Sequence, residues 1–292
     1  MNGPAAVTTN PIQLGHNASL GGYRPFPDDS PWNRDVSADP VDPSSDAIIA
    51  AMGRDKPLFP NFGSRAGIAY FVVPGDQQRV PVAFGAFARE SDPGPYPIPA
   101  EAPLEMDPPR RALVLERDTR LLYELYGATR DGQGWRAEGG FVFDLKANAP
   151  RPARWTSADA AGLPILPGLV RYDEVAEQQT IRHALRFSVS RSRAAYVEPA
   201  RHSVGSATDP RLPPMGMRVR LKADVDISSF SPEMQVVLTA LKKHGMFVAE
   251  HGTDWFLHGT ADARWNDKDL LSLARIKGKD FEVVRMGILQ TK

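Results

Sequence analysis

Side chains that can transfer protons or bind polar ligands are concentrated between Trp155 and His202. This stretch contains the acidic residues Asp159 and Glu174 and the histidines His183 and His202. Carboxylates and imidazoles are the groups that most often act as general acids and bases near neutral pH. The segment is therefore the first place to look for chemistry, although it contains no motif with a known reaction attached.

Glu174 and His183 are the first pair of candidate catalytic residues. They are nine residues apart, a gap that a short helix and a turn can close. A carboxylate beside a histidine can fix its tautomer or share its proton, as acid and base catalysis requires. Asp173 should point elsewhere, since neighbouring side chains diverge. The alternatives are an exposed helical Glu174 and a hydrogen-bonded core His183 at the start of a strand.

His202 is the third candidate catalytic residue, because PARH ends where a strand gives way to a loop. Residues at such positions often face a cleft. Arg201 could hold a carboxylate or a sugar hydroxyl, so it is a candidate for substrate binding. Strand alternation would turn Arg201 and His202 to opposite faces unless the backbone bends. An ordinary surface loop is the alternative.

Three further residues are candidates for substrate binding. Trp155 offers a flat apolar face on which a sugar ring could stack, or it could pack in the core. Asp159 could contact substrate, or it could be a charge in the first turn of a helix capped at Ser157. Tyr96 lies in a proline-rich stretch (90–109) that could line a groove or simply cover the surface.

Cysteine is absent, which excludes disulfides, thiolate metal sites and cysteine nucleophiles. One metal hypothesis adds a carboxylate to His183 and His202 as ligands. Another possible site is HGTDWFLHG, where His251, Asp254 and His258 lie close together in a spacing that matches no metal signature. We therefore assign no residue as a metal ligand and expect no cofactor.

Charge and hydropathy exclude several classes of protein. The 292 residues include 35 basic and 35 acidic side chains, so no general basic surface for nucleic acid is expected. No apolar run approaches the length of a membrane span. The N-terminal residues lack the basic start and apolar region of a signal peptide. The oligomeric state stays open.

The order of elements predicts a mainly β protein, either an antiparallel β-sandwich or a distorted barrel with a few peripheral helices. Residues 1–22 are small and polar and predict a flexible tail. Residues 23–292 are expected to form a single mostly-β domain, which begins with an extended arm anchored by Trp32.

Three strand pairs and one helix support this prediction. Strands 69–74 and 79–84 suggest a hairpin in which Pro81 confines the second strand to an edge or bulge. Strands 112–118 and 120–127 predict another antiparallel pair. SPEMQVVLTALKKHG (231–245) has a capping serine, a proline in the first turn and two C-terminal lysines, which predict a helix. MFVAE and DWFLHG predict a further strand pair.

FPDDSPWN, ESDPGPYPIP, WTSADAAGLPILPGLVRYDEV, IRHALRF and PARH together resemble a family of uncharacterised bacterial proteins that are often exported. The resemblance spans most of the chain after Tyr23. It implies one coherent unit and a secreted or periplasmic location. It carries no activity or catalytic residue onto these positions.

The leading hypothesis is a carbohydrate-active enzyme that cleaves a polysaccharide by acid and base catalysis, as a glycoside hydrolase or a lyase. A hydrolase usually needs two carboxylates roughly 5 to 10 Å apart, so Asp159 or Asp173 would join Glu174. A lyase would depend on the histidines. The alternatives are a non-catalytic glycan-binding or cell-surface protein and a metal enzyme with histidine ligands. The expected partner is a polysaccharide or an oligosaccharide.

Overall fold

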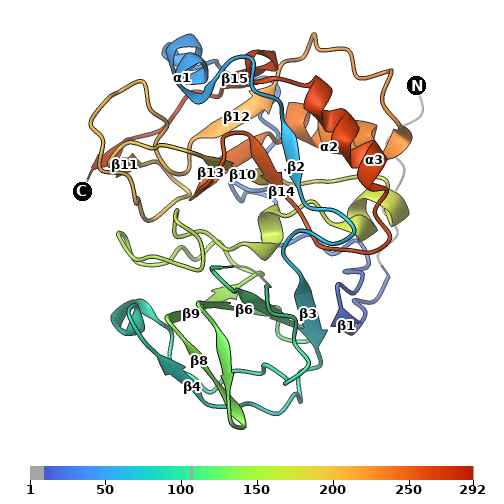
Figure 1. Ribbon diagram of the computed structural model, residues 1–292, viewed down its shortest axis with the longest axis vertical. Helices are drawn as coiled ribbons and strands as arrows, with labels where there is room; N and C mark the ends of the chain where they lie inside the picture. The colour runs from blue at the N-terminus through green and yellow to red at the C-terminus, as the bar shows by residue number, and fades with distance from the viewer. Residues whose placement is uncertain (1–9, 106–107, 292) are drawn as a thin grey trace.

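Strands outnumber helices in the computed structural model, which describes residues 10–105 and 108–291. Strands make up 26% and helices 16% of it, which confirms the prediction of a mainly β protein. The described residues form several open sheets and no closed barrel. Figure 1 shows a lower lobe, made of a five-stranded and a three-stranded sheet, and an upper lobe, made of a six-stranded sheet with helices against it.

The lower lobe is built on a five-stranded sheet with the order β1-β3-β5-β6-β9. A three-stranded sheet, β4-β8-β7, packs beside it. The strands are β1 (Gly15–His16), β3 (Tyr70–Val73), β4 (Val82–Phe84), β5 (Ala112–Glu116), β6 (Leu121–Tyr126), β7 (Thr129–Asp131), β8 (Gly134–Ala137) and β9 (Gly139–Asp144).

The upper lobe is built on a six-stranded sheet with the order β15-β12-β13-β10-β14-β2. A short pair, β11 and β16, lies at the C-terminal end of the chain. The strands are β2 (Phe59–Asn61), β10 (Leu185–Val189), β11 (Ala195–Tyr196), β12 (Arg218–Leu221), β13 (Met246–His251), β14 (Phe256–His258), β15 (Phe281–Val283) and β16 (Gln290–Thr291).

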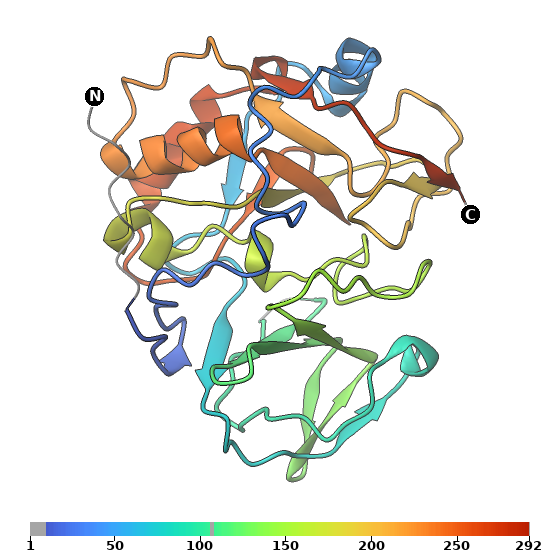
Figure 2. The same cartoon turned by 180° about the vertical axis from the view of Figure 1, so that it is seen from behind.

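The helices are short and lie mainly around the upper lobe (Figure 2). The α-helices are α1 (Ser45–Met52), α2 (Pro232–Lys243) and α3 (Asp267–Leu270). Single turns of other helix types occur at Ala88–Glu90, Leu166–Gly168, Asp173–Glu177, Leu271–Arg275 and Gly278–Asp280. Among the described residues, no helix is both long and apolar enough to cross a membrane.

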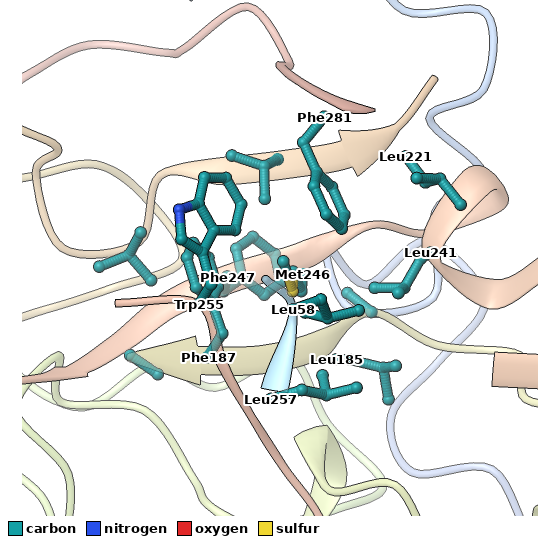
Figure 3. Packing of buried hydrophobic residues seen from close by; sticks show 14 of the residues in the cluster. Leu58, Leu185, Phe187, Leu221, Leu241, Met246, Phe247, Trp255, Leu257 and Phe281 are labelled. Atoms are coloured by element: carbon teal, nitrogen blue, oxygen red, sulfur yellow. The ribbon is translucent and has the colours of Figure 1, made fainter. Parts of the chain in front are cut away.

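The helix expected at 231–245 is present as α2. Its capping residue Ser231 accepts a hydrogen bond from the Met234 amide, and Pro232 starts the first turn. Met234, Val237 and Leu241 are buried under the six-stranded sheet, whose packing with Leu241 is shown in Figure 3. Local signals were sufficient here because cap, apolar stripe and C-terminal lysines all indicate one helix.

The strand pairings differ in part from those expected. β5 and β6 form the predicted antiparallel pair, but β3 pairs with β1 and β5 whereas β4 pairs in parallel with β8. The hairpin expected from 69–84 is therefore wrong. β13 and β14 are not neighbours either, because β10 lies between them. The sheets mix parallel and antiparallel pairs, so the expected purely antiparallel arrangement is also wrong.

Residues 10–22, part of the stretch expected to be a flexible tail, pack against the lower lobe. β1 pairs with β3, and Ile12 and Leu20 are buried in the cluster that covers one face of β5. The Leu20 amide donates a hydrogen bond to Asp173 at 2.8 Å. Few apolar side chains are enough to order this segment, because its backbone groups find hydrogen-bond partners in other parts of the protein. Residues 1–9 lie outside the described part of the chain.

The sheet of the lower lobe is covered on both faces. Leu113 and Leu115 of β5 join the cluster beneath the upper lobe, whereas Ala112 and Val114 join the cluster beneath the three-stranded sheet. Strand alternation turns consecutive side chains to opposite faces. Every second side chain of β5 and β6 therefore faces the junction between the lobes.

Candidate functional site

The segment from Trp155 to His202 runs between the two lobes (Figures 1 and 2). It leaves the lower lobe after β9, forms a series of loops and turns, and enters the six-stranded sheet as β10. Residues 156–171 are all buried. The candidate residues in this segment consequently lie in the interior or beside the junction, not on one exposed face.

The structure brings Glu174 and His183 into direct contact. His183 Nε2 lies 3.0 Å and 3.1 Å from the two carboxylate oxygens of Glu174. The π-helical turn Asp173–Glu177 folds the chain back, and the Thr180 amide closes this turn on the Glu174 carbonyl at 3.0 Å. His183 Nδ1 lies 2.9 Å from the Ala184 carbonyl. A carbonyl oxygen only accepts, so Nδ1 is the donor in this contact.

Arg171 neutralises the carboxylates of this turn. Its Nη2 lies 2.8 Å from Glu174 and its Nε 3.3 Å from Asp173, so the two acidic side chains share one guanidinium instead of diverging. Burial alone would raise the pKa of Glu174, but Arg171 and His183 outweigh it and hold the pKa below its usual value. Glu174 is therefore an anion bound by two cationic or proton-donating groups.

Access to the Glu174–His183 pair is narrow. Glu174 lines a hollow of about 10 Å³ together with Tyr23, Arg24 and Arg182, a space that accommodates about one water molecule. The His183 side chain is 2% exposed. The pair can exchange protons with a water molecule, but a sugar cannot reach it in this conformation.

His202 does not join this pair. Its Nδ1 lies 3.0 Å from the Ala160 carbonyl, and its backbone amide donates to the Ala161 carbonyl at 3.0 Å. Neither a hydrogen bond nor an ion pair connects His202 with Glu174 or His183. The three residues expected to transfer protons therefore lie in two separate places, since the loop 160–162 determines where His202 packs.

Arg201 faces a cavity at the junction of the lobes, as a binding residue would. The cavity has a volume of about 170 Å³, and we call it the junction groove. Its lining is mainly apolar and includes three aromatic rings and four prolines, with Arg201, Arg151 and Glu198 as its charged groups. Arg201 Nε donates to the Arg151 carbonyl at 2.9 Å and its Nη1 lies 3.1 Å from Glu198, so its guanidinium is held at the wall of the groove.

The aromatic lining of the junction groove comes from segments far apart in the sequence. Phe26 and Trp32 belong to the N-terminal arm and stack with centroids 6.4 Å apart, whereas Phe143 belongs to β9. Trp32 also packs against Phe247 of β13 at 5.1 Å. Sequence reasoning identified Trp32 only as an anchor and missed Phe26 and Phe143, because no local pattern shows that the arm lies across both lobes.

The other expected binding residues lie outside this groove. Tyr96 is fully buried, and its hydroxyl donates to the Asp92 carbonyl at 2.7 Å, so its ring is a core residue of the lower lobe. Trp155 lies beside the groove with the Arg151 guanidinium 5.7 Å from its ring centroid. Neither ring lines the cavity.

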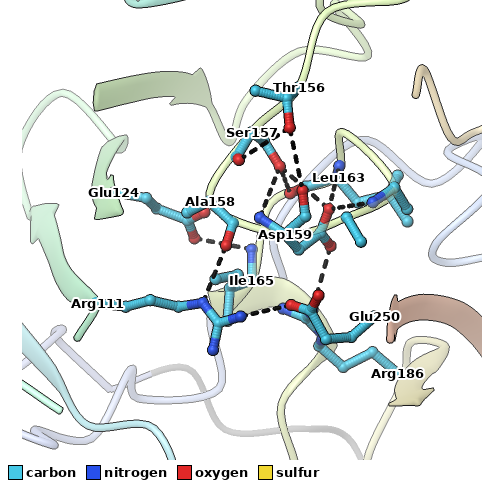
Figure 4. Close-up of polar contacts among 12 residues, drawn as sticks. Arg111, Glu124, Thr156, Ser157, Ala158, Asp159, Leu163, Ile165, Arg186 and Glu250 are labelled. Atoms are coloured by element: carbon cyan, nitrogen blue, oxygen red, sulfur yellow. Dashed lines mark hydrogen bonds and ion pairs between the residues drawn. The ribbon is translucent and has the colours of Figure 1, made fainter. Parts of the chain in front are cut away.

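Asp159 belongs to a buried polar network shown in Figure 4. Its Oδ1 accepts from the amides of Ala161 and Leu163, both at 2.9 Å, and its Oδ2 lies 3.2 Å from Arg186. Both side chains are fully buried, and through these hydrogen bonds Asp159 organises the loop that follows it. No helix begins at Ser157, so Asp159 is not the first-turn helical charge that was one alternative.

The network continues to residues that sequence reasoning missed. Arg111 of the lower lobe forms ion pairs with Glu105 and with Glu250 of β13. Glu124 of β6 accepts hydrogen bonds from the Ile165 and Leu166 amides at 2.8 Å and 3.2 Å. Burial raises the pKa of Glu124 to about 8, although those amides and Arg186 favour the anion. Arg111–Glu250 connects the two lobes directly.

The histidines and carboxylates do not assemble into a metal site. Within residues 10–105 and 108–291, no group of three or more such side chains could hold an ion. His251 contacts Ser192 at 2.7 Å, whereas Asp254 pairs with Lys56 at 2.6 Å, so these members of HGTDWFLHG have separate partners. The hypothesis of a histidine-ligated metal enzyme has no donor set to support it among these residues.

The site has to be interpreted from its own geometry. No protein-family model, curated protein or solved structure matches the chain.

Proposed function

We propose that the protein binds a saccharide in the junction groove. The observation that carries this proposal is the combination of Phe26, Trp32 and Phe143 with Arg201 around one cavity. Saccharides present apolar ring faces that pack on aromatic side chains, and hydroxyl groups that accept hydrogen bonds from a guanidinium. We further propose, from the resemblance to often exported proteins, that binding takes place outside the cytoplasm.

Binding without cleavage is the better supported role for this groove. Its lining contains one carboxylate, Glu198, whose side chain is 73% exposed, and no histidine. Hydrolysis of a glycosidic bond normally uses two carboxylates roughly 5 to 10 Å apart. The groove lacks the second one, so the glycan-binding alternative takes precedence over the polysaccharide-cleaving enzyme.

Titration calorimetry with soluble oligosaccharides tests this proposal. We expect Phe26→Ala and Arg201→Gln each to weaken binding by about tenfold, because each removes a stacking or charge-assisted contact. Phe59→Ala and Arg264→Gln are matched controls, since Phe59 stacks on Phe256 and Arg264 pairs with Asp262 outside the groove. Absence of saccharide binding, or binding that both groove variants leave unchanged, would reject the proposal.

Acid and base catalysis at Glu174 and His183 is the second candidate function. It is favoured by the 3.0 Å contact between the carboxylate and the imidazole, and it requires a movement that opens the water-sized hollow. Release of reducing ends or unsaturated products from a polysaccharide should then fall sharply in Glu174→Gln and His183→Ala. No turnover by the parent protein, or undiminished turnover by both folded variants, would rule this function out.

A further inference from the structure

A second cavity adjoins the junction groove. It has a volume of about 250 Å³ and shares Pro31, Glu198 and Pro199 with the groove. Its lining includes Arg218 and Arg285, together with Arg34; we call it the arginine cavity. A ligand that extends past Pro31 and Pro199 would pass from an aromatic space into a basic one.

Arg218 is buried at the wall of this cavity without an acidic partner. The residue is 8% exposed, and its guanidinium carbon lies 4.2 Å from the ring centroid of Phe247. It donates a hydrogen bond to the Pro31 carbonyl. Within the described residues, no carboxylate forms an ion pair with it, and burial together with Arg34 lowers its pKa to about 9.

Arg220, a second arginine on the same strand, has the acidic partner that Arg218 lacks within the described chain. Arg220 lies two residues further along β12 and so shares a face with Arg218. Its Nε lies 2.7 Å from Glu282 of β15. Opposite Arg218 lies Val284, the residue that follows the end of β15, whose amide donates to the Arg218 carbonyl at 3.0 Å. The fold thus places an acid opposite Arg220 and an apolar residue opposite Arg218.

Two arginines of these cavities have no acidic partner in the part of the chain that the structure describes. The linings of both cavities together contain five arginines (Arg34, Arg151, Arg201, Arg218, Arg285) and two carboxylates (Asp29, Glu198). Three of the arginines form ion pairs, Arg34 with Asp39, Arg151 with Asp92 and Arg201 with Glu198, so among the described residues Arg218 and Arg285 are the cations left without a carboxylate. Charge lining a cleft with apolar walls raises the local concentration of ligands of opposite sign.

We propose that the ligand of the junction groove is an acidic saccharide, whose carboxylate or sulfate group is bound by Arg218 in the arginine cavity. This inference rests on the proposed saccharide binding. A planar guanidinium recognises such anions through two parallel hydrogen bonds. The adjoining sugar would lie against the aromatic lining, and Arg285, which is exposed, would contribute a longer-range attraction.

The test compares charged and neutral forms of the same polymers. Calorimetry would use oligomers of polygalacturonate, alginate and hyaluronate, each beside its carboxyl-reduced counterpart, with chondroitin sulfate oligomers as the sulfated probe. We expect a charged form to bind at least about tenfold more tightly than its reduced counterpart, with an advantage that shrinks as salt is added. A preference for the sulfated oligomer over every uronate would identify sulfate as the recognised group.

Variants separate this inference from the underlying proposal. Arg218→Gln should remove most of the preference for the charged form, and Arg285→Gln, at an exposed position where folding is not at risk, should reduce it a few-fold. Arg65→Gln, exposed and outside both cavities, is the matched control. Equal binding of charged and reduced forms, unaffected by Arg218→Gln and Arg285→Gln, would overturn the acidic ligand and leave saccharide binding intact. Failure of every polymer to bind would overturn both.

Discussion

Arg171 and Arg218 are both buried arginines, yet the two regions around them are organised differently. Arg171 lies between Asp173 and Glu174, and these carboxylates overcome burial so that its pKa is raised. Arg218 faces an aromatic ring and a cavity, and burial lowers its pKa to about 9. The first charge is neutralised within the fold, whereas the second is left for a group outside it.

Whether a buried charge is paired within the protein distinguishes structural residues from candidate binding residues better than the type of side chain does. The Glu174–His183–Arg171 cluster contains the side chains typical of catalysis, but its charges satisfy one another and its entrance admits about one water molecule. The arginine cavity contains Arg218 and Arg285, which have no acidic partner among the described residues, and it adjoins the apolar surface of the junction groove. Ligand sites typically combine an apolar lining with a few polar groups that can bond the ligand.

The largest expected effect is that of Arg171→Met. This substitution leaves the buried Asp173 without a counter-ion and Glu174 with His183 alone, and we expect the free energy of unfolding to fall by about 3 to 5 kcal/mol. Urea denaturation near neutral pH measures the change. Arg218→Met is the matched control, and we expect it to cost less than about 1 kcal/mol, because it removes a buried charge that has no acidic partner. Equal losses of stability in Arg171→Met and Arg218→Met would contradict the difference proposed between the two arginines.

Glu124 extends the comparison to an acid, since it is buried without an ion-pair partner among the described residues. Its folded carboxyl keeps a proton up to about pH 8, against 4.5 for the ordinary side chain. The folded state therefore binds more protons than the unfolded state between these values, and its stability falls as the pH rises through this window. Glutamine does not titrate. We therefore expect the free energy of unfolding of Glu124→Gln to rise relative to that of the parent by a few kcal/mol as the pH increases across this window.

Thermal unfolding of both proteins at a series of pH values measures this gain. Leu122→Val, which lies on the same face of β6, controls for a loss of packing without a titrating group; it should lower the melting temperature equally at every pH. A constant difference between Glu124→Gln and the parent from pH 5 to pH 8 would show that Glu124 is ionised in the folded protein.

Local patterns predicted elements whose stabilising contacts are close in sequence. The cap at Ser231 and the apolar stripe of α2 are contained in fifteen residues, and the β5–β6 pair closes through a short turn. Pairing of β4 with β8 and of β13 with β10 depends on contacts between distant segments. Strand propensity does not distinguish among such partners.

The candidate site likewise contains residues that are close in sequence and residues that come from distant segments. Glu174 and His183 are nine residues apart, so a turn can bring them together and the sequence could suggest it. Phe26, Phe143 and Arg201 lie in three distant segments, and their common cavity exists only when the arm crosses both lobes. Tyr96 is buried in the core of the lower lobe, which a proline-rich stretch of sequence does not reveal.

The sequence by itself determined a mainly β protein, the helix α2 and a segment rich in ionisable groups, because these follow from periodicity, capping and composition. Only the tertiary structure decided which of those groups are neutralised. It placed Arg171 between two acids, put Glu282 opposite Arg220, and left Arg218 beside Val284 and a cavity. The physical reason is that the state of a buried charge depends on its partners in space, and those partners come from distant parts of the chain.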